Sequence, residues 1–413
     1  MKKTLCLLLA ALMIALALTL AACSEEKPQE TSPAEGTDAP AQTEPQTPAD
    51  DAAETEPEPA AEPEPQAEEP AEAEAEAQTP AEPEPPVEQS MYATEVAAGA
   101  EPVSIEKGLT LVRVEDCGFS AFLSGGGASS DQEMLTFLFS MLKVPSPKLD
   151  FELPGIGCST IAATTPEGGR AFGRNFDWSC NNVILLEAHP SDGYASFSTV
   201  NTDFITEAAR TKLADDAMAA ASYYAPLDGM NEKGLCISVN MISDSARIQQ
   251  RTDLPDLTTT TAVRLLLDRA ATVDEAIELL KSYDLHGSYD MMIHFAISDA
   301  AGRAVAVEYV NQELCVTETP ILTNFYVTEG SKYGIGAEES HRRFEALEKF
   351  VSEHETATIY EVREALMAAK ESDYDSDPSE RTEWSVVYDQ TNLAATWYRR
   401  ERFEEGWTVK LVP

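Results

Sequence analysis

Three side chains that lie close together in the sequence could between them form an activated nucleophile. Cys158 follows the Gly-Ile-Gly sequence at residues 155–157, and Arg174 and Asp177 come sixteen and nineteen positions after it. A thiol attacks only as the thiolate, and a neighbouring cation lowers its pKa. One β-hairpin would bring the thiol, the guanidinium and the carboxylate together, so the spacing indicates a cysteine nucleophile. A core cysteine beside a structural ion pair is the alternative that the spacing leaves open.

A cut in the chain before Cys158 would supply the base that this thiol needs. The new α-amine of Cys158 would have a reference pKa of about 7.7–8.0, so it could take the thiol proton without help from a histidine. The chain has five histidines, and none stands beside Cys158. Gly157 has no side chain that could obstruct attack of the thiol on the Gly157 carbonyl. We therefore predict autocatalytic cleavage between Gly157 and Cys158.

The first residues of the chain are typical of an export signal. A basic head at residues 1–3 precedes an almost wholly apolar stretch at residues 5–20, too short for an ordinary membrane span. The stretch ends in Leu-Ala-Ala-Cys, which resembles the lipobox of bacterial lipoproteins. We therefore expect a signal peptide at residues 1–22, lipidation of Cys23, and an extracytoplasmic protein anchored to the bacterial cell membrane. A plain secretory signal is the alternative.

Residues 23–90 form an acidic segment that is rich in Pro, Ala and Glu. After Cys23 it holds twenty-one acidic side chains and Lys27 as the one basic residue. Such a composition buries too little apolar area to offset the entropy of the backbone, so we expect a disordered tether. Specific binding by the acidic tract is the alternative. The whole chain has a formal net charge of −43, which argues against a nucleic-acid partner, because phosphate binding needs a basic surface.

The rest of the chain alternates between strand-rich and helix-rich blocks. Strands are expected at residues 109–114, 159–164, 170–174, 183–188, 194–200, 234–241, 291–297, 304–309, 314–316, 384–388, 394–399 and 407–411. Helices are expected at residues 133–143, 261–270, 272–283, 340–353 and 359–370. Residues 129–131, with Ser130, are expected to cap the first of these helices, and Thr272 begins a Thr-Val-Asp-Glu capping-box pattern at the third. Residues 201–226 carry no recognisable pattern and are expected as a loop. The block order predicts an α+β fold with two antiparallel sheets between two helix layers.

Five sequence blocks in this order resemble the choloylglycine hydrolase family of N-terminal-nucleophile hydrolases. The first block is Cys158 with Arg174 and Asp177. The others are Gly-Met-Asn-Glu-Lys-Gly-Leu at 229–235 followed by Asn240, Leu-Thr-Asn at 322–324, Ser-His-Arg-Arg-Phe at 340–344 and Trp-Ser-Val-Val-Tyr-Asp at 384–389. Bile salt hydrolase, penicillin V acylase and other linear amide C–N hydrolases belong to that family. The resemblance covers residues 158–413 and implies a four-layer αββα sandwich.

The resemblance also implies a role for each matching residue. Cys158 would be the nucleophile, Arg174 would hold its thiolate, and Asp177 would orient the new amine. Asn240 and a backbone N–H would stabilise the oxyanion. Asn324 and Arg343 would complete the polar network near the amine and the substrate. Three alternatives stay open: Asn240 could cap a turn, Arg343 could be a surface residue of a helix, and Arg342 could take the role given to Arg343.

Two features depart from the pattern of bile salt hydrolases. Their cysteine follows the initiator methionine, whereas 157 residues precede Cys158 in this chain. We interpret residues 91–157 as a propeptide or alpha segment and residues 158–413 as the amidohydrolase domain. The block from Gly234 to Asn240 is also one residue shorter than in bile salt hydrolases, which bears on the role of Asn240.

The expected activity is hydrolysis of a linear, non-peptide amide bond through a thioester at Cys158. The substrate would be an N-acyl amine, an N-acyl amino acid or a bile-salt-like conjugate. An acyltransferase related to acyl-coenzyme A:6-aminopenicillanate acyltransferase and a non-catalytic binding lipoprotein are the alternatives. The mechanism needs no cofactor, and the histidines show no metal-ligand spacing, so neither is expected. The expected partners are the small amide substrate and the membrane, and homo-oligomers are left open.

The cysteines after residue 90 are compatible with one free thiol and up to two disulfides. They are Cys117, Cys158, Cys180, Cys236 and Cys315. Their pairing cannot be read from the sequence. Cys236 and Cys315 stand inside apolar runs, so we expect both as buried, unpaired thiols.

Overall fold

The structure is a computed structural model that describes residues 93–143, 146–149, 157–178, 182–210, 212–372 and 381–412. The predicted signal peptide, Cys23 and the tether lie outside these residues, and so does Cys180. All described residues belong to one unit that spans residues 83–413. Within them, no helix is both long and apolar enough to cross a bilayer.

The first sheet has seven strands and contains the predicted nucleophile hairpin. Its order is β1 (Ala93–Glu95), β18 (Gly406–Lys410), β17 (Ala394–Arg399), β16 (Arg381–Asp389), β5 (Arg170–Trp178), β4 (Gly157–Thr164) and β15 (Ile321–Leu322). Neighbouring strands are antiparallel except for the parallel pair β1–β18.

The second sheet has nine strands and also begins upstream of the predicted cut. Its order is β14 (Glu313–Glu318), β13 (Ala304–Val310), β12 (Met292–Ser298), β9 (Cys236–Ile242), β8 (Asp228–Asn231), β7 (Ser196–Asn201), β6 (Val183–Ala188), β3 (Leu109–Val114) and β2 (Val103–Glu106). The β3–β6 pair is parallel. Both sheets are therefore mixed, whereas the sequence predicted purely antiparallel ones. The parallel pairs join segments far apart in the chain, which local patterns do not reveal.

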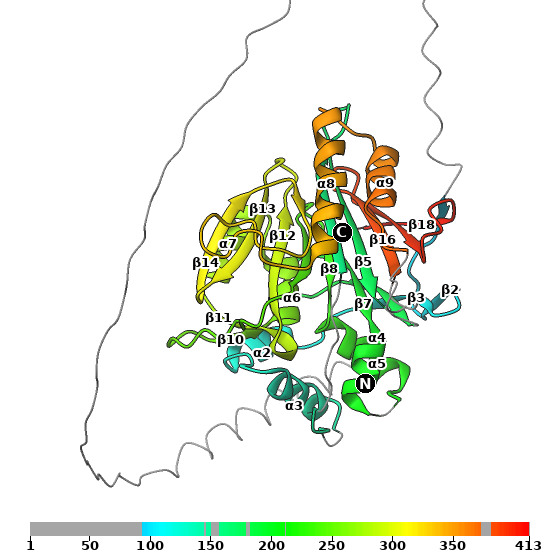
Figure 1. Ribbon diagram of the computed structural model, residues 1–413. Helices are drawn as coiled ribbons and strands as arrows, with labels where there is room; N and C mark the ends of the chain where they lie inside the picture. The colour runs from blue at the N-terminus through cyan, green and yellow to red at the C-terminus, as the bar shows by residue number, and fades with distance from the viewer. Residues whose placement is uncertain are drawn as a thin grey trace, which may run out of the picture. The chain divides into compact units, whose positions relative to one another are not determined.

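Helices cover the outer faces of both sheets, so the fold is a four-layer α+β sandwich (Figure 1). On the first sheet lie α8 (Glu338–Glu353) and α9 (Ile359–Ala368), and on the second lie α6 (Thr259–Arg269) and α7 (Val273–Leu280). The remaining elements are α2 (Phe119–Ser124), α3 (Asp131–Met141), α4 (Thr202–Ala209), α5 (Asp215–Tyr223), the short pair β10 (Asp256–Thr258) and β11 (Asp284–His286), and the 3-10 turn η2 (Ser288–Asp290). The helices α4 and α5 replace the loop that we expected at residues 201–226.

Local sequence signals explain where several helices begin. The Thr272 hydroxyl accepts a hydrogen bond from the Glu275 N–H at the start of α7, and Ser130 caps α3 in the same way. Each cap satisfies a backbone donor that the helix itself leaves unpaired. The predicted capping residues are thus confirmed at both helices.

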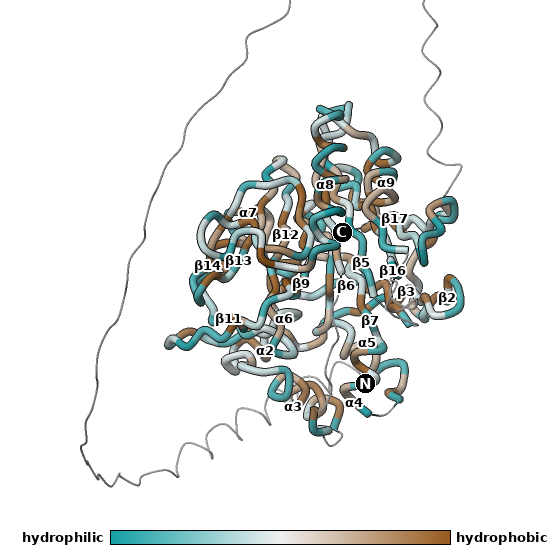
Figure 2. Tube along the Cα trace, in the orientation of Figure 1, coloured by the Kyte–Doolittle hydropathy of each residue, from teal (hydrophilic) through white to brown (hydrophobic). Residues whose placement is uncertain are grey.

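Apolar side chains fill the spaces between the layers. Between the sheets, Phe176 stacks on Trp384 with ring centroids 3.9 Å apart. Separate apolar clusters lie under α6 and α7 and under α8 and α9. In Figure 2, apolar stretches run along β12, whereas hydrophilic residues cover much of α8. Burial of these faces, at about 25 cal/mol per Å² of apolar surface, holds the two sheets at the spacing that places the site between them.

Candidate active site

The hairpin of β4 and β5 sets the positions of the three residues that the sequence singled out. Gly157 pairs with Asp177, Cys158 with Phe176, and Thr160 with Arg174. Because side chains alternate along a strand, Cys158 and Arg174 point from one face and Asp177 from the other. The thiol and the guanidinium therefore lie between the two sheets, whereas Asp177 faces the layer of α8 and α9.

Arg174 lies against the thiol and is completely buried. Its Nη2 atom is 3.4 Å from the Cys158 Sγ atom and donates to the Val239 carbonyl at 2.8 Å. Its Nη1 atom pairs with a carboxylate oxygen of Asp228 at 2.7 Å. Burial raises the pKa of the Cys158 thiol above its ordinary value, and the Arg174 cation acts in the opposite direction. In the uncut chain the thiol therefore has no strong drive to ionise.

Asp228 is the site residue that the sequence analysis missed. Its Oδ1 atom accepts from the Tyr388 hydroxyl at 2.6 Å, and its Oδ2 atom accepts from the Trp384 Nε1 atom at 3.1 Å. These bonds fix the carboxylate that holds Arg174 in place. A signal was available, because an acidic residue directly precedes the block at 229–235. Its partner on β5 is far away in the sequence, so the pairing itself could not be read.

Asp177 belongs to a polar group on the opposite face of the hairpin. Its Oδ1 atom accepts from the Thr382 hydroxyl at 2.6 Å, and its Oδ2 atom lies 3.4 Å from the Arg343 Nη1 atom. Within the described residues, Oδ2 is buried and accepts no hydrogen bond. Burial raises the pKa of the Asp177 carboxyl, and Arg343 works against this shift. Since Asp177 pairs with Gly157, it lies beside the bond that we expect to be cut.

Arg343 occupies the site, and its neighbour Arg342 does not. Arg343 is 1% exposed and donates to the Cys158 carbonyl and, at 2.9 Å, to the Ser159 hydroxyl. The side chain of Arg342 is 59% exposed and pairs with Glu371. The helix α8 therefore presents Arg343 to the hairpin, and the surface alternative for this residue does not hold.

Asn324 binds the backbone nitrogen that would become the new amine. Its Oδ1 atom accepts from the Cys158 N–H at 2.7 Å and from the Arg343 Nη2 atom at 2.8 Å. Its Nδ2 atom donates to the Met241 carbonyl at 2.7 Å. The structure thus brings Asn324 and Arg343 together at the backbone of Cys158, and their roles in the reaction stay predictions.

Asn240 lies near this network, and its printed hydrogen bonds go to other groups than the thiol. Its Nδ2 atom donates to the Thr323 carbonyl at 3.1 Å and to the Leu322 carbonyl at 3.4 Å, and its Oδ1 atom accepts from Ser238. The amide therefore supports the segment that carries Asn324. Its role as an oxyanion donor stays a prediction.

A buried pair, His294 and Glu308, contacts the segment that carries Asn324. The His294 Nε2 atom lies 2.9 Å from the Thr323 carbonyl, and its Nδ1 atom lies 2.8 Å from Glu308. The ring therefore bridges the Thr323 carbonyl and the Glu308 carboxylate. Glu308 also accepts from the N–H groups of Val327 and Thr328. Burial alone would raise the pKa of Glu308, but these hydrogen bonds lower it below its ordinary value.

Replacing His294 by leucine should loosen the segment that carries Asn324. The change leaves Glu308 buried without its main partner, so we expect the free energy of unfolding in urea to fall by about 3–5 kcal/mol. Because the pKa of Glu308 is lowered on folding, wild type has this contribution above the ordinary carboxyl pKa and loses it in acid. The control is His354→Leu on the outer end of α8. Equal unfolding free energies for both variants would show that the His294–Glu308 pair does not stabilise this segment.

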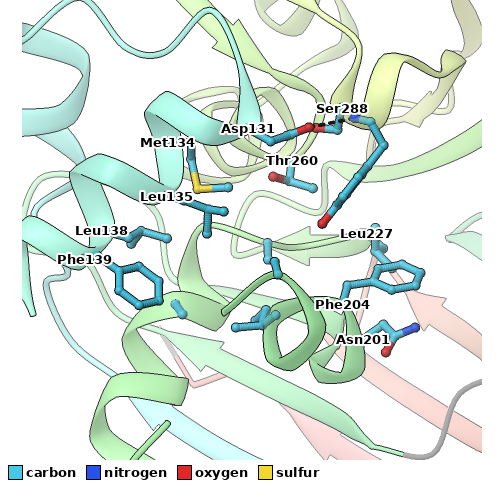
Figure 3. A pocket seen from close by; sticks show the side chains of 15 residues that line it. Asp131, Met134, Leu135, Leu138, Phe139, Asn201, Phe204, Leu227, Thr260 and Ser288 are labelled. Carbon is cyan, nitrogen blue, oxygen red and sulfur yellow. Dashed lines mark hydrogen bonds between the residues drawn. The ribbon is translucent and has the colours of Figure 1, made fainter. Parts of the chain in front are cut away.

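A narrow cavity of about 50 Å³ lies beside the thiol. Apolar side chains line most of it, and hydroxyl-bearing residues of α6 and η2 complete the wall. A second cavity, drawn in Figure 3, shares part of this wall. Among the described residues, no group of three or more His, Cys, Asp or Glu side chains could hold a metal ion. Cys117, Cys158, Cys236 and Cys315 are free thiols. Cys236 is buried as expected, whereas Cys315 is only partly buried, because its strand β14 lies at the edge of the sheet.

Comparisons with known proteins find a family match in the part of the chain that contains most of this site. Residues 158–327 match the family of linear amide C–N hydrolases known as the choloylglycine hydrolase family. The chain is 30% identical over 181 residues to bile salt hydrolase/transferase from Clostridium perfringens (strain 13 / Type A), covering 40% of this chain and 53% of that protein. It thus spans about half the length of the curated relative. The resemblance drawn from the sequence is confirmed for residues 158–327.

Solved structures of the same kind are similar to part of this chain. A variant of conjugated bile acid hydrolase from Clostridium perfringens has 15% identity and a TM-score of 0.46, covering 62% of this chain and 92% of that one. Penicillin V acylase from Agrobacterium tumefaciens has 16% identity and a TM-score of 0.41, covering 59% and 83%.

Proposed function

We propose that this protein is a cysteine amidase that hydrolyses a linear, non-peptide amide bond with Cys158 as its N-terminal nucleophile. The observation that carries the proposal is the setting of Cys158. Its thiol touches the buried Arg174 guanidinium, while its backbone nitrogen already bonds to Asn324. The family match over residues 158–327 supports the reaction class.

The first step would be cleavage of the chain itself. The Cys158 thiol adds to the Gly157 carbonyl, the C–N bond between the two residues breaks, and the nitrogen takes up a proton as the new α-amine. Water then opens the thioester and leaves a carboxylate on Gly157. Arg343 and Asn324 already hold the backbone of Cys158, so they would keep the new terminus in place. The Oδ2 atom of Asp177 accepts no hydrogen bond within the described residues, and it would accept one from the amine.

The same groups would then act on the substrate. The amine takes the thiol proton, and the sulfur adds to the carbonyl carbon of the amide to give an oxyanion. The leaving amine receives that proton as the C–N bond breaks, and water resolves the thioester to the free acid. The Arg174 Nη2 atom, 3.4 Å from the Cys158 sulfur, would stabilise the thiolate. We also propose that the oxyanion accepts a hydrogen bond from Asn240 or from a backbone N–H.

The pH dependence of the rate should report the amine. We expect kcat/KM to fall about tenfold per pH unit below the amine pKa of about 7.7–8.0, because the protonated amine cannot accept the thiol proton. The ionised Asp177 would favour the protonated amine, so Asp177→Asn should move this limb to lower pH by about one unit or more. Ser159→Ala on the same face is the control. If kcat/KM of Asp177→Asn falls at the same pH as that of wild type, Asp177 does not interact with the amine.

Acyl transfer is the second candidate, because the curated relative is named as both a hydrolase and a transferase. Hydrolysis releases the free acid, whereas transfer joins the acyl group to a second amine. Product analysis with and without added glycine or taurine separates the two. If the free acid is the main product in the presence of millimolar acceptor, the protein is an amidase. If a new amide is the main product, it is an acyltransferase.

The proposed location is the outer surface of a bacterial membrane, with the lipid on Cys23. The proposal rests on the sequence Leu-Ala-Ala-Cys at residues 20–23 and on the acidic segment that follows it. Metabolic labelling with radioactive palmitate tests it. Wild type should take up the label and Cys23→Ser should not, and a labelled Cys23→Ser protein would exclude this anchor.

A further inference from the structure

Glu371 is a buried carboxylate beside the active site that none of the steps above uses. It comes shortly after α9 ends at Ala368, lies outside the five sequence blocks and is 3% exposed. Its Oε1 atom lies 2.9 Å from the Arg343 Nε atom and accepts a hydrogen bond from the Arg342 Nη2 atom at 2.7 Å. The carboxylate therefore bridges the two arginines of α8, the buried one at the site and the exposed one next to it.

The three nitrogens of the Arg343 guanidinium face three different partners. The Nη1 atom donates to the Cys158 carbonyl, and the Nη2 atom donates to the Asn324 Oδ1 atom at 2.8 Å. The Nε atom faces Glu371. A guanidinium is rigid and planar, so a partner at Nε fixes the directions of both Nη atoms. Glu371 therefore sets the angle at which Arg343 reaches the backbone of Cys158.

A second set of contacts ties Glu371 to Asp177 through Thr382. The Thr382 hydroxyl accepts from the Glu371 N–H at 2.9 Å and donates to the Asp177 Oδ1 atom at 2.6 Å. The Thr382 N–H donates in turn to the Glu371 carbonyl at 2.8 Å. The Asp177 Oδ2 atom lies 3.4 Å from Arg343, which closes a ring of four residues. The ring joins β5, β16 and α8 next to the bond that we expect to be cut.

This ring holds two carboxylates around one buried cation. Asp177 and Glu371 both lie against Arg343, and Arg342 is the exposed cation on the outer side of Glu371. Burial raises the pKa of the Glu371 carboxyl, Arg343 opposes this shift, and Asp177 adds to it. Glu401 also raises the pKa of Asp177. A new α-amine in this place would be a second buried cation, and the second carboxylate would balance its charge.

We propose that Glu371 is a positioning residue of the amidase, which holds Arg343 against the Cys158 backbone and supplies a second negative charge near the new α-amine. The inference rests on the proposed function, because both roles concern the nucleophile and its new terminus. The other charged groups around this terminus are Asp177 of β5 and Arg343 of α8, with Arg174 on the opposite face of the hairpin.

The rate of self-cleavage tests the positioning role. The chain is made by cell-free translation, and the cut before Cys158 is followed by intact mass. Glu371→Ala leaves the Arg343 Nε atom without this partner, so the cleavage rate should fall by about 100-fold. Glu371→Gln keeps an oxygen acceptor in place and should stay within about threefold of wild type. The control is Glu353→Gln at the exposed end of α8, which should match wild type. Cleavage of Glu371→Ala at the wild-type rate would overturn the inference.

A pH profile of the cut protein tests the charge, and it needs only Glu371→Gln if the alanine variant does not fold. The rate at which iodoacetamide alkylates Cys158 is measured against pH, and the labelled peptide is identified by mass spectrometry. Loss of a nearby negative charge lowers the pKa of both the amine and the thiol. The midpoint should therefore move to lower pH by about half a unit in Glu371→Gln and stay in place in Glu353→Gln. A midpoint of Glu371→Gln at the wild-type pH would overturn the charge role.

Neither readout needs a substrate, so each proposal can fail by itself. A wild-type chain that is cut and alkylated as expected, but hydrolyses no amide, would overturn the amidase and keep the role of Glu371. Amide hydrolysis at Cys158, with wild-type cleavage in Glu371→Ala and an unmoved midpoint in Glu371→Gln, would overturn this inference alone. A wild-type chain that is never cut would overturn both.

Discussion

Replacing Cys158 by alanine abolishes amide hydrolysis and leaves the chain in one piece. The thiol is the attacking group in both reactions, so kcat should fall by at least about 10⁴-fold, and the intact mass should show no cut before residue 158. The buried sulfur contacts Arg174 and the Val239 carbonyl. An alanine there removes the nucleophile and a small buried volume, so the fold should persist.

Cys236→Ala is the matched control for this experiment. Cys236 is also a buried thiol, on the neighbouring sheet, and burial raises its pKa well above the ordinary value. It should keep both processing and activity. A Cys158→Ala protein that is still cut, or that still hydrolyses the amide at the wild-type rate, would remove Cys158 from the chemistry.

Replacing Asp228 by asparagine should be the most destabilising change at the site. The side chains of Arg174 and Asp228 are both fully buried and lie 2.7 Å apart. Removing the carboxylate leaves the Arg174 cation without its counter-charge, which typically costs about 3–5 kcal/mol of unfolding free energy. The guanidinium also loses its anchor, so we expect kcat to fall by about 100-fold. Urea unfolding and turnover on the same preparation measure both effects.

A double variant distinguishes a lost ion pair from general damage. Arg174→Gln combined with Asp228→Asn replaces the pair by two neutral amides, so it should be more stable than Asp228→Asn alone and still inactive. The exposed pair of Glu278 and Lys281 supplies the control, because Glu278→Gln should change stability by less than about 1 kcal/mol. A double variant that is less stable than Asp228→Asn would show that the charge pair is not the cause.

The features that could be predicted from the sequence are those that depend on local spacing. The β4–β5 hairpin, the caps at Ser130 and Thr272, and the outer helices follow from alternation and from residues within one helical turn. The choice between Arg342 and Arg343 needed the structure, because both lie on α8 and only its rotation against β4 decides which one is buried.

The features that could not be predicted depend on contacts between distant segments. Asp228 reaches Arg174 from the other sheet, and its hydroxyl and indole partners are about 160 residues further along the chain. The helices α4 and α5 are short, with eight and nine residues, so their periodicity is weak in a single sequence. The parallel pairing of β3 with β6 depends on the same long-range packing, so the sequence predicted only a propeptide or alpha segment at residues 91–157.

The most direct test of the central claim is to trap the acyl group on the enzyme. The purified protein is mixed with N-dodecanoylglycine, quenched in acid during turnover, digested, and analysed by mass spectrometry. The account predicts a peptide that begins at Cys158 and carries a dodecanoyl group as a thioester on its sulfur, released by neutral hydroxylamine. An acyl group on another residue, or on a Cys158 that is still joined to Gly157, would contradict it.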